Sequence, residues 1–165
     1  MVSYEKVRRS LRTATITIIV LNSLSLVFRL FTGISVQLAK TEINKGNTGN
    51  LPKEHIEAVL SATTPFMLFV TALIVLVNIA IVIFCIKNLR AINLRAIKRN
   101  QMVNYLPYYL GFAITVGLVI LGFLTTKAPW AIAINIVFQA IFGLLYLHAY
   151  QKAQKLNERD LEETN

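Results

Sequence analysis

Arg29 is the residue of this sequence whose chemistry stands out most. It lies inside Thr13–Val36, a stretch of 24 residues that carries no other charge. A charge at the centre of a bilayer costs at least about 2.5–3.5 kcal/mol on insertion scales, so its presence needs a reason. Either the long stem lifts the guanidinium to the lipid headgroups, or the guanidinium faces inward and binds an anion or a partner's carboxylate. In the second case, we expect its hydrogen-bond donors to be met by Thr64, Asn135 or water.

Uncharged polar residues also recur at helical spacing in the apolar stretches. Asn22 precedes Arg29 by seven residues, Asn78 belongs to a row with a period of seven, and Asn135 and Gln139 are four apart. Side-chain hydrogen bonds hold transmembrane helices together, at roughly 0.6–2 kcal/mol per contact. The first interpretation is therefore helix packing. The second is a ligand, solute or partner contact, for which the candidate residues are Arg29, Asn22, Asn78, Asn135 and Gln139.

Small residues mark the stretch Leu106–Thr126 in a different way. Gly111, Thr115 and Gly122 fall on one helical face, while Ala113 and Gly117 fall on another. Because small residues let two helix backbones approach closely, this pattern favours a packed helix pair.

The sequence contains few of the residue combinations that enzymes use for catalysis. The one cysteine, Cys85, excludes disulfide exchange between cysteine pairs, and the two histidines, His55 and His148, are predicted on opposite sides of the membrane. The sequence contains no Gly-rich phosphate loop and no plausible Ser-His-Asp set. We therefore predict no catalytic residues, no metal, no cofactor and no enzymatic activity.

The elements that must position these residues are four apolar segments. Hydrophobic residues make up 55% of the 165 residues and charged residues 15%, against about 25% charge in soluble domains. Segments 13–36, 59–86, 106–126 and 128–149 each reach the roughly 20 residues that a membrane-spanning helix needs. The expected fold is all-α: a polytopic membrane protein in which residues 1–165 form a single domain, a bundle of four transmembrane helices.

The basic residues predict how this bundle is oriented. Of the 17 Lys and Arg residues, 12 lie in the N-terminal segment, the segment between the second and third spans, and the C-terminal tail. The positive-inside rule then places both termini in the cytoplasm, in a multi-pass protein of the plasma or inner membrane. Arg90, Arg95, Lys98 and Arg99 are expected to contact lipid headgroups. This distribution does not point to nucleic acid.

The connections between the spans have their own signals. Residues 40–57 are polar and contain Gly46 and Gly49, which predicts a turn region, and Pro65 predicts a mild kink in the second span. Helix-favouring composition extends two spans into the cytoplasm, as helix ends over 87–100 and 150–163. The short connection at Thr125–Pro129 predicts an antiparallel hairpin of the last two spans.

Surfaces suited to helix contacts are thus plentiful, while groups that carry chemistry are few. We expect a non-enzymatic integral membrane protein: an accessory, regulatory or immunity-type subunit of a membrane complex. Its expected partners are the lipid bilayer and either another membrane protein or a second copy of itself. The alternative is a small oligomeric transporter or channel for an anion or polar solute.

Overall fold

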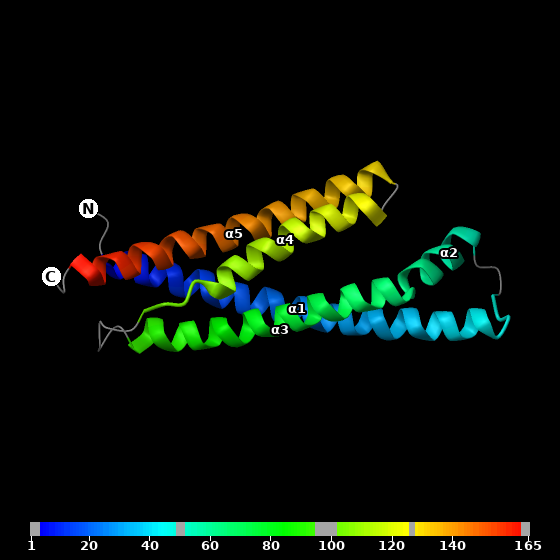
Figure 1. Cartoon of the computed structure of the whole chain (residues 1–165), viewed down its shortest axis with the longest axis horizontal. Coiled ribbons are helices and arrows are strands. Elements are labelled where there is room, and N and C mark those ends of the chain that lie inside the picture. The colour runs from blue at the N-terminus through cyan, green and yellow to red at the C-terminus, as the bar shows by residue number, and fades with distance from the viewer. Residues whose placement is uncertain (1–3, 49–51, 95–101, 126–127, 163–165) are drawn as a thin grey trace. The chain divides into compact units, whose positions relative to one another are not determined.

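The computed structural model describes residues 4–48, 52–94, 102–125 and 128–162, and these ranges contain helices and no strand. The helices are α1 (Tyr4–Asn44), α2 (Lys53–Ala62), α3 (Pro65–Leu94), α4 (Leu106–Thr125) and α5 (Pro129–Glu162) (Figure 1). Four of them, α1, α3, α4 and α5, are long and apolar enough to cross a membrane. The all-α class and the four transmembrane helices predicted from the sequence are confirmed.

The two longest helices exceed what a bilayer requires. Helix α1 has 41 residues and α5 has 34. At 1.5 Å per residue they measure about 61 Å and 51 Å, against about 30 Å for the hydrocarbon core. The predicted helix end at 150–163 is observed as far as Glu162. The one at 87–100 is observed as far as Leu94, and its remainder lies outside the described residues.

The second predicted span needs a correction at its start. In place of a mild kink within 59–86, the chain leaves the helical conformation at Thr63 and Thr64, and α3 begins at Pro65. Proline suits the first turn of a helix, where its missing N–H costs nothing, but it cannot continue a preceding one. The Thr63 hydroxyl donates to the carbonyls of Val59 and Leu60 at 3.0 and 3.1 Å, which stabilises the break.

The predicted turn region 40–57 is shorter than expected, because helices enter it from both sides. Helix α1 ends in a Schellman motif: Gly46, at φ 80°, donates its N–H to Ile43 at 3.0 Å, and the Asn47 N–H donates to the Glu42 carbonyl at 3.0 Å. The side chains of Asn47 and Lys45 also donate to the Glu42 carboxylate, and both hydrogen bonds lower the pKa of Glu42. This turn is therefore fixed by its own hydrogen bonds.

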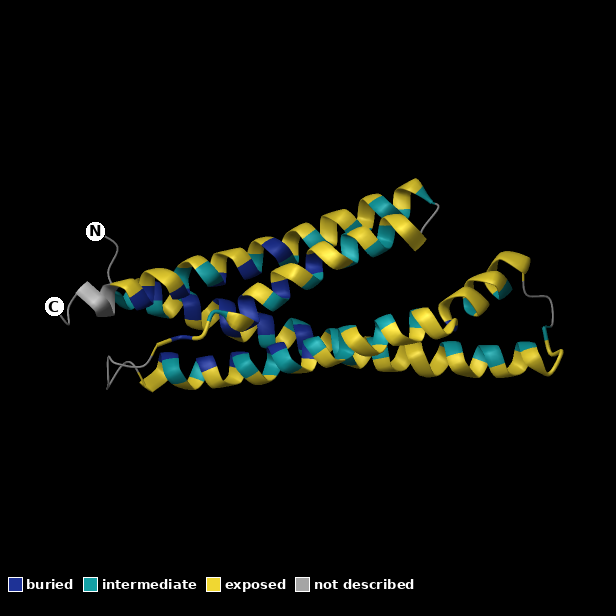
Figure 2. Cartoon of the chain, in the orientation of Figure 1, coloured by how far each residue is buried: buried dark blue, intermediate teal, exposed yellow. Residues whose placement is uncertain are grey.

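The chain divides into two compact units, each described here by itself. Unit 1 comprises Met1–Asn22 and Ala80–Asn165, and unit 2 comprises Ser23–Ile79. Figure 2 colours the residues by burial. In unit 1 the buried apolar side chains come from α1, α3, the segment before α4, and both later helices: Val7, Leu11, Ala14, Ile18, Ile81, Cys85, Ile92, Val103, Tyr108, Tyr146, Ala149, Ala153 and Leu156. Most of them recur at steps of three or four, so each helix buries one stripe.

Candidate functional site

The small face predicted on α4 packs against α5, and the two helices form the predicted hairpin (Figure 1). The Tyr146 ring occupies the space where a side chain on Gly111 would lie, and the Asn135 amide does the same at Gly122. By contrast, Gly117 has open space around its Cα. The spacing of the small residues thus predicted the correct packing face.

Asn135 and Gln139, two of the candidate contact residues, lie within this hairpin. The Asn135 amide donates to the Leu118 carbonyl of α4 at 3.1 Å, and the Gln139 amide donates to Asn135 Oδ1 at 3.3 Å. The structure therefore brings these two residues together, and it uses Asn135 to fasten α5 to α4.

Asn22, a third candidate, is also engaged within unit 1. Its side chain is 5% exposed, and its amide donates to the Tyr146 hydroxyl at 2.7 Å and to the Ile18 carbonyl at 2.8 Å. Both amide hydrogens are then used. Since Tyr146 packs against Gly111, this contact joins α1 to the α4–α5 hairpin.

A second buried tyrosine forms a similar junction. Tyr108 of α4 is 1% exposed, and its hydroxyl lies 2.9 Å from Thr15 Oγ1 of α1 and 3.4 Å from Asn88 Nδ2 of α3. Three helices of unit 1 thus meet at one hydroxyl group. A buried phenol needs such partners, because an unpaired polar group in an apolar environment is costly.

The segment before α4 is held from both sides by asparagine side chains. Asn88 donates to the Asn104 carbonyl at 2.7 Å and accepts from its N–H at 3.0 Å. Asn157 of α5 pairs with the peptide groups of Val103 in the same way, at 3.0 Å in both directions. Each side-chain amide therefore forms the hydrogen bonds that a neighbouring backbone would form in a helix or sheet. The peptide groups of Val103 and Asn104 are thus hydrogen-bonded although they lie outside any helix.

We call these two asparagines, Asn88 and Asn157, the clamps of this segment. They were not predicted from the sequence. Asn88 lies in the predicted helix end 87–100, and Asn157 lies in the C-terminal tail. A usable signal exists, because Asn88 continues the apolar row of Ile81 and Cys85, and Asn157 adjoins that of Ala153. A single asparagine on an otherwise apolar helical stripe would have marked both positions.

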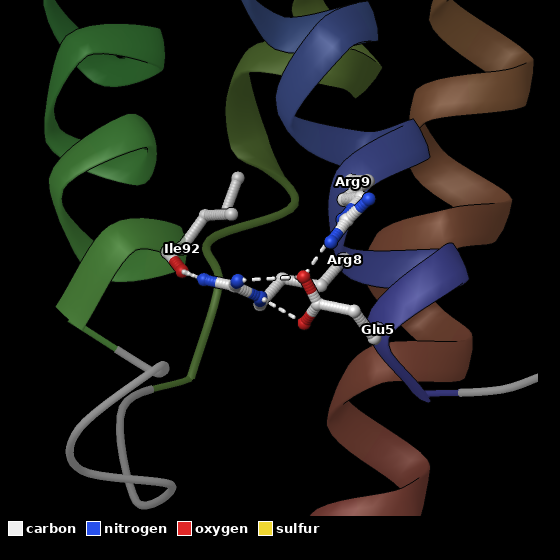
Figure 3. A network of polar contacts seen from close by, with 4 residues as sticks. All are labelled: Glu5, Arg8, Arg9 and Ile92. Carbon is white, nitrogen blue, oxygen red and sulfur yellow. Dashed lines mark hydrogen bonds and ion pairs between the residues drawn. The ribbon is translucent and has the colours of Figure 1, made fainter.

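Charged residues of unit 1 gather at the start of α1 (Figure 3). Glu5 accepts hydrogen bonds from Arg8 at 3.0 Å and from Arg9 at 2.8 Å, and Arg8 also donates to the Ile92 carbonyl of α3 at 3.5 Å. Arg8 first, and then Arg9, lower the pKa of Glu5 to about 2. Of the predicted headgroup contacts, Arg90 is exposed on α3, and Arg95, Lys98 and Arg99 lie outside the described residues.

The polar residues of unit 2 differ from those of unit 1 in their hydrogen bonds. Among its described residues only Thr63 and Asn78 are buried, and the Asn78 side chain, 4% exposed, makes no hydrogen bond to any described residue. Arg29 is half-buried, and its Nε is fully buried without a hydrogen-bond partner.

Thr64 and Asn135 were the side chains expected as hydrogen-bond partners of Arg29. Thr64 donates its hydroxyl to the Ser61 carbonyl at 3.1 Å, and Asn135 is engaged within the α4–α5 hairpin. Within unit 2 no hydrogen bond joins Arg29 to Thr64, and the contact with Asn135, which belongs to unit 1, stays a prediction. Arg29 and Asn78 are therefore the two candidate residues whose polar groups are not taken up by the described chain.

A shallow groove runs along the α4–α5 pair. It encloses about 360 Å³ and is lined mainly by apolar side chains, with Thr115 and Gln139 as its polar residues. In a membrane such a groove suits a lipid tail or an apolar helix face better than a hydrated solute.

No metal centre is indicated within the described ranges, where no three His, Cys, Asp or Glu residues lie close enough to hold an ion. Comparison with protein-family models, with curated proteins and with solved structures found no match to this chain.

Proposed function

We propose that this small membrane protein is a non-enzymatic accessory, regulatory or immunity-type subunit of a membrane complex. It is inserted in the cell membrane with both termini in the cytoplasm, as the positive-inside rule predicts. In this proposal unit 1 anchors the chain, and unit 2 contacts the partner, which is another membrane protein or a second copy.

The observation that carries this proposal is a difference between the two units in the hydrogen bonds that their polar side chains form. Asn22, Asn88 and Asn157 of unit 1 each bind another part of that unit. In unit 2, Arg29 Nε is fully buried without a hydrogen-bond partner, and Asn78 makes no hydrogen bond to a described residue. Because buried polar groups are normally hydrogen-bonded, those of unit 2 are suited to completion by another molecule.

The transporter or channel alternative has less support. Three of the five residues suggested to line a path, Asn22, Asn135 and Gln139, are engaged in hydrogen bonds within unit 1. The groove beside Gln139 is apolar, which does not suit an anion or polar solute. A packing function accounts for these three side chains without any solute.

Affinity purification from native membranes tests the proposal. With a tag after Asn165, we expect a membrane protein to co-purify at a fixed ratio in mild detergent. Asn78→Leu should weaken that recovery, because it removes a polar group of unit 2. Gln139→Leu is the matched control, since it changes a polar residue of unit 1, and it should retain the partner.

A flux measurement tests the alternative on the same preparation. Proteoliposomes of the purified chain should not transport anions or polar solutes across a broad panel. Transport that Gln139→Leu abolishes would contradict the accessory role and support the channel.

A further inference from the structure

We propose that Arg29 binds the carboxylate of an Asp or Glu side chain within a transmembrane helix of the partner. This inference rests on the proposed function and adds the chemistry of the contact. It starts from a guanidinium that the described chain leaves unpaired: Nε is fully buried without a partner, and neither Nη forms a hydrogen bond with a described residue.

The chain holds no anion that could pair with Arg29 inside the membrane. The apolar spans contain no Asp or Glu. The nearest acidic residue along α1 is Glu42, thirteen residues away, and its carboxylate already accepts from Lys45 and Asn47. A counter-ion for Arg29 must therefore come from another molecule.

The geometry of unit 2 indicates how deep Arg29 lies. Lys40 of α1 donates to the Thr63 carbonyl at 3.4 Å, two residues before α3 begins, and this contact gives a common reference point on the two helices. Arg29 precedes Lys40 by eleven residues of an unbroken helix, which corresponds to about 16 Å. The predicted span ends at Val36, so Arg29 lies about 10 Å inside that end, in the outer third of the hydrocarbon core.

The burial of Nε argues against the headgroup explanation considered from the sequence. A guanidinium that rises to the lipid phosphates keeps its nitrogens in water, whereas Arg29 Nε is fully buried. The partner's side chain must come to Arg29 within the membrane.

Asn78 provides a second polar group at a similar depth. Helices α1 and α3 run antiparallel in unit 2 (Figure 1), so distances can be counted from the Lys40–Thr63 contact along both. Asn78 follows Thr63 by fifteen residues, which places it about 6 Å deeper than Arg29. Two polar side chains without a hydrogen bond to a described residue thus lie about one helical turn apart in depth within unit 2.

The residue type at position 29 fits a carboxylate. Arginine stays charged in apolar surroundings, and its planar fork matches a carboxylate with two parallel hydrogen bonds. The apolar side chains around it on α1, among them Phe28, Leu30 and Phe31, are exposed and suited to pack against a transmembrane helix.

A synthetic transmembrane peptide tests this inference directly. The probes are two polyleucine helices that differ at the central residue, one with Glu and one with Gln, added to phosphatidylcholine vesicles that hold the full chain. Energy transfer between the labelled peptide and a label on Asn47→Cys, in a Cys85→Ser background, reports association. We expect the Glu peptide to bind more tightly by a factor on the order of ten.

Variants of the full chain assign that preference to the guanidinium. Arg29→Gln should abolish the difference between the two peptides, and Arg29→Lys should reduce it, because an ammonium cannot reproduce the fork. Lys40→Gln removes another cation of unit 2 and should keep the full difference. Circular dichroism checks that every variant keeps its helices.

Several outcomes would overturn the inference. One is equal binding of both peptides by the wild type or a preference that survives Arg29→Gln. Another is loss of the preference when an anionic phosphatidylglycerol is added, which would assign the guanidinium to lipid phosphate. Recovery of a native partner by wild type and Arg29→Gln alike would reject this inference and leave the proposed function standing.

Discussion

Asn78 and Asn88 lie on the same helix with nearly equal exposure, 4% and 3%, and yet the two units use them differently. Asn88 of unit 1 exchanges two hydrogen bonds with the Asn104 peptide groups and touches Tyr108. Asn78 of unit 2 binds no described residue. Burial alone therefore does not show what an asparagine of this helix does, and its partners must be known as well.

The apolar side chains repeat this difference. Unit 1 buries a stripe from each of its helices, with close approaches at Gly111 and Gly122. In unit 2 the described large side chains remain partly or fully exposed, and the only buried residues described are Thr63 and Asn78. Unit 1 resembles a finished core, and unit 2 resembles half of an interface.

The largest effect is expected where unit 1 is packed most closely. Gly111→Ala places a methyl group where the Tyr146 ring lies, and moving the ring breaks its bond to Asn22. Overpacking costs roughly 1–3 kcal/mol, and the lost hydrogen bond adds about 1 kcal/mol. Unfolding in mixed micelles with rising dodecyl sulfate, followed by circular dichroism, measures the loss.

Two other glycines of α4 serve as graded controls. Gly122→Ala should cost less than Gly111→Ala, because it displaces the end of the Asn135 side chain rather than a buried ring. Gly117→Ala meets open space and should be neutral, or stabilising by up to about 1 kcal/mol through helix propensity. Equal losses at all three positions would show that the α4–α5 packing is misplaced.

A smaller effect on stability is expected from substitution of Asn88 in unit 1 and Asn78 in unit 2, and the two substitutions should differ. Asn88→Leu leaves the Asn104 N–H and carbonyl without their partner, which should destabilise the fold by about 1–2 kcal/mol. Asn78→Leu removes no hydrogen bond within the described chain, so the fold should keep its stability. The same micelle titration compares them, and a larger loss for Asn78→Leu would contradict the contrast between the units.

The smallest effect concerns pH and the start of α1. The pKa of Glu5 falls from its usual 4.5 to about 2 in the folded state, because Arg8 and Arg9 hold the carboxylate. Its ion pairs therefore stabilise the fold fully above pH 4.5, and that contribution is lost as the pH falls toward 2. Glu5→Gln should lower stability slightly at neutral pH, and the difference from wild type should shrink over this range.

Glu57→Gln is the control for that measurement. Its carboxylate forms no ion pair in the described structure, so this substitution should lower stability less than Glu5→Gln does at neutral pH. Added salt should reduce the Glu5 effect, since the pair is exposed and screened. A Glu5→Gln difference that persists unchanged below pH 2 would contradict the assignment.

Much of the fold could be predicted, because apolar length and helical spacing are local signals. The four spans, the α4–α5 hairpin and the small face at Gly111 and Gly122 all followed from them. The break at Thr63 was underestimated as a kink, since whether a helix bends or ends before Pro65 depends on nearby acceptors for the two threonines. Such acceptors are not visible in a pattern.

The candidate site was predictable in its residue types but not in its partners. Arg29, Asn22 and Asn78 were singled out as one class, because each is a polar group in an apolar span. Only the packing of helices distant in sequence separates Asn22, which binds Tyr146, from Asn78, which binds nothing described. The clamps at Asn88 and Asn157 were missed for the same reason.

The central claim, that unit 2 rather than unit 1 contacts the partner, is tested most directly by photocrosslinking in native membranes. Phe28 of unit 2 and Phe138 of unit 1 are phenylalanines of similar exposure, 62% and 58%, and each can be replaced by benzoylphenylalanine with little change of shape. We predict a discrete protein adduct of one mass from position 28, and lipid adducts alone from position 138. A protein adduct from position 138, with none from position 28, would contradict the account.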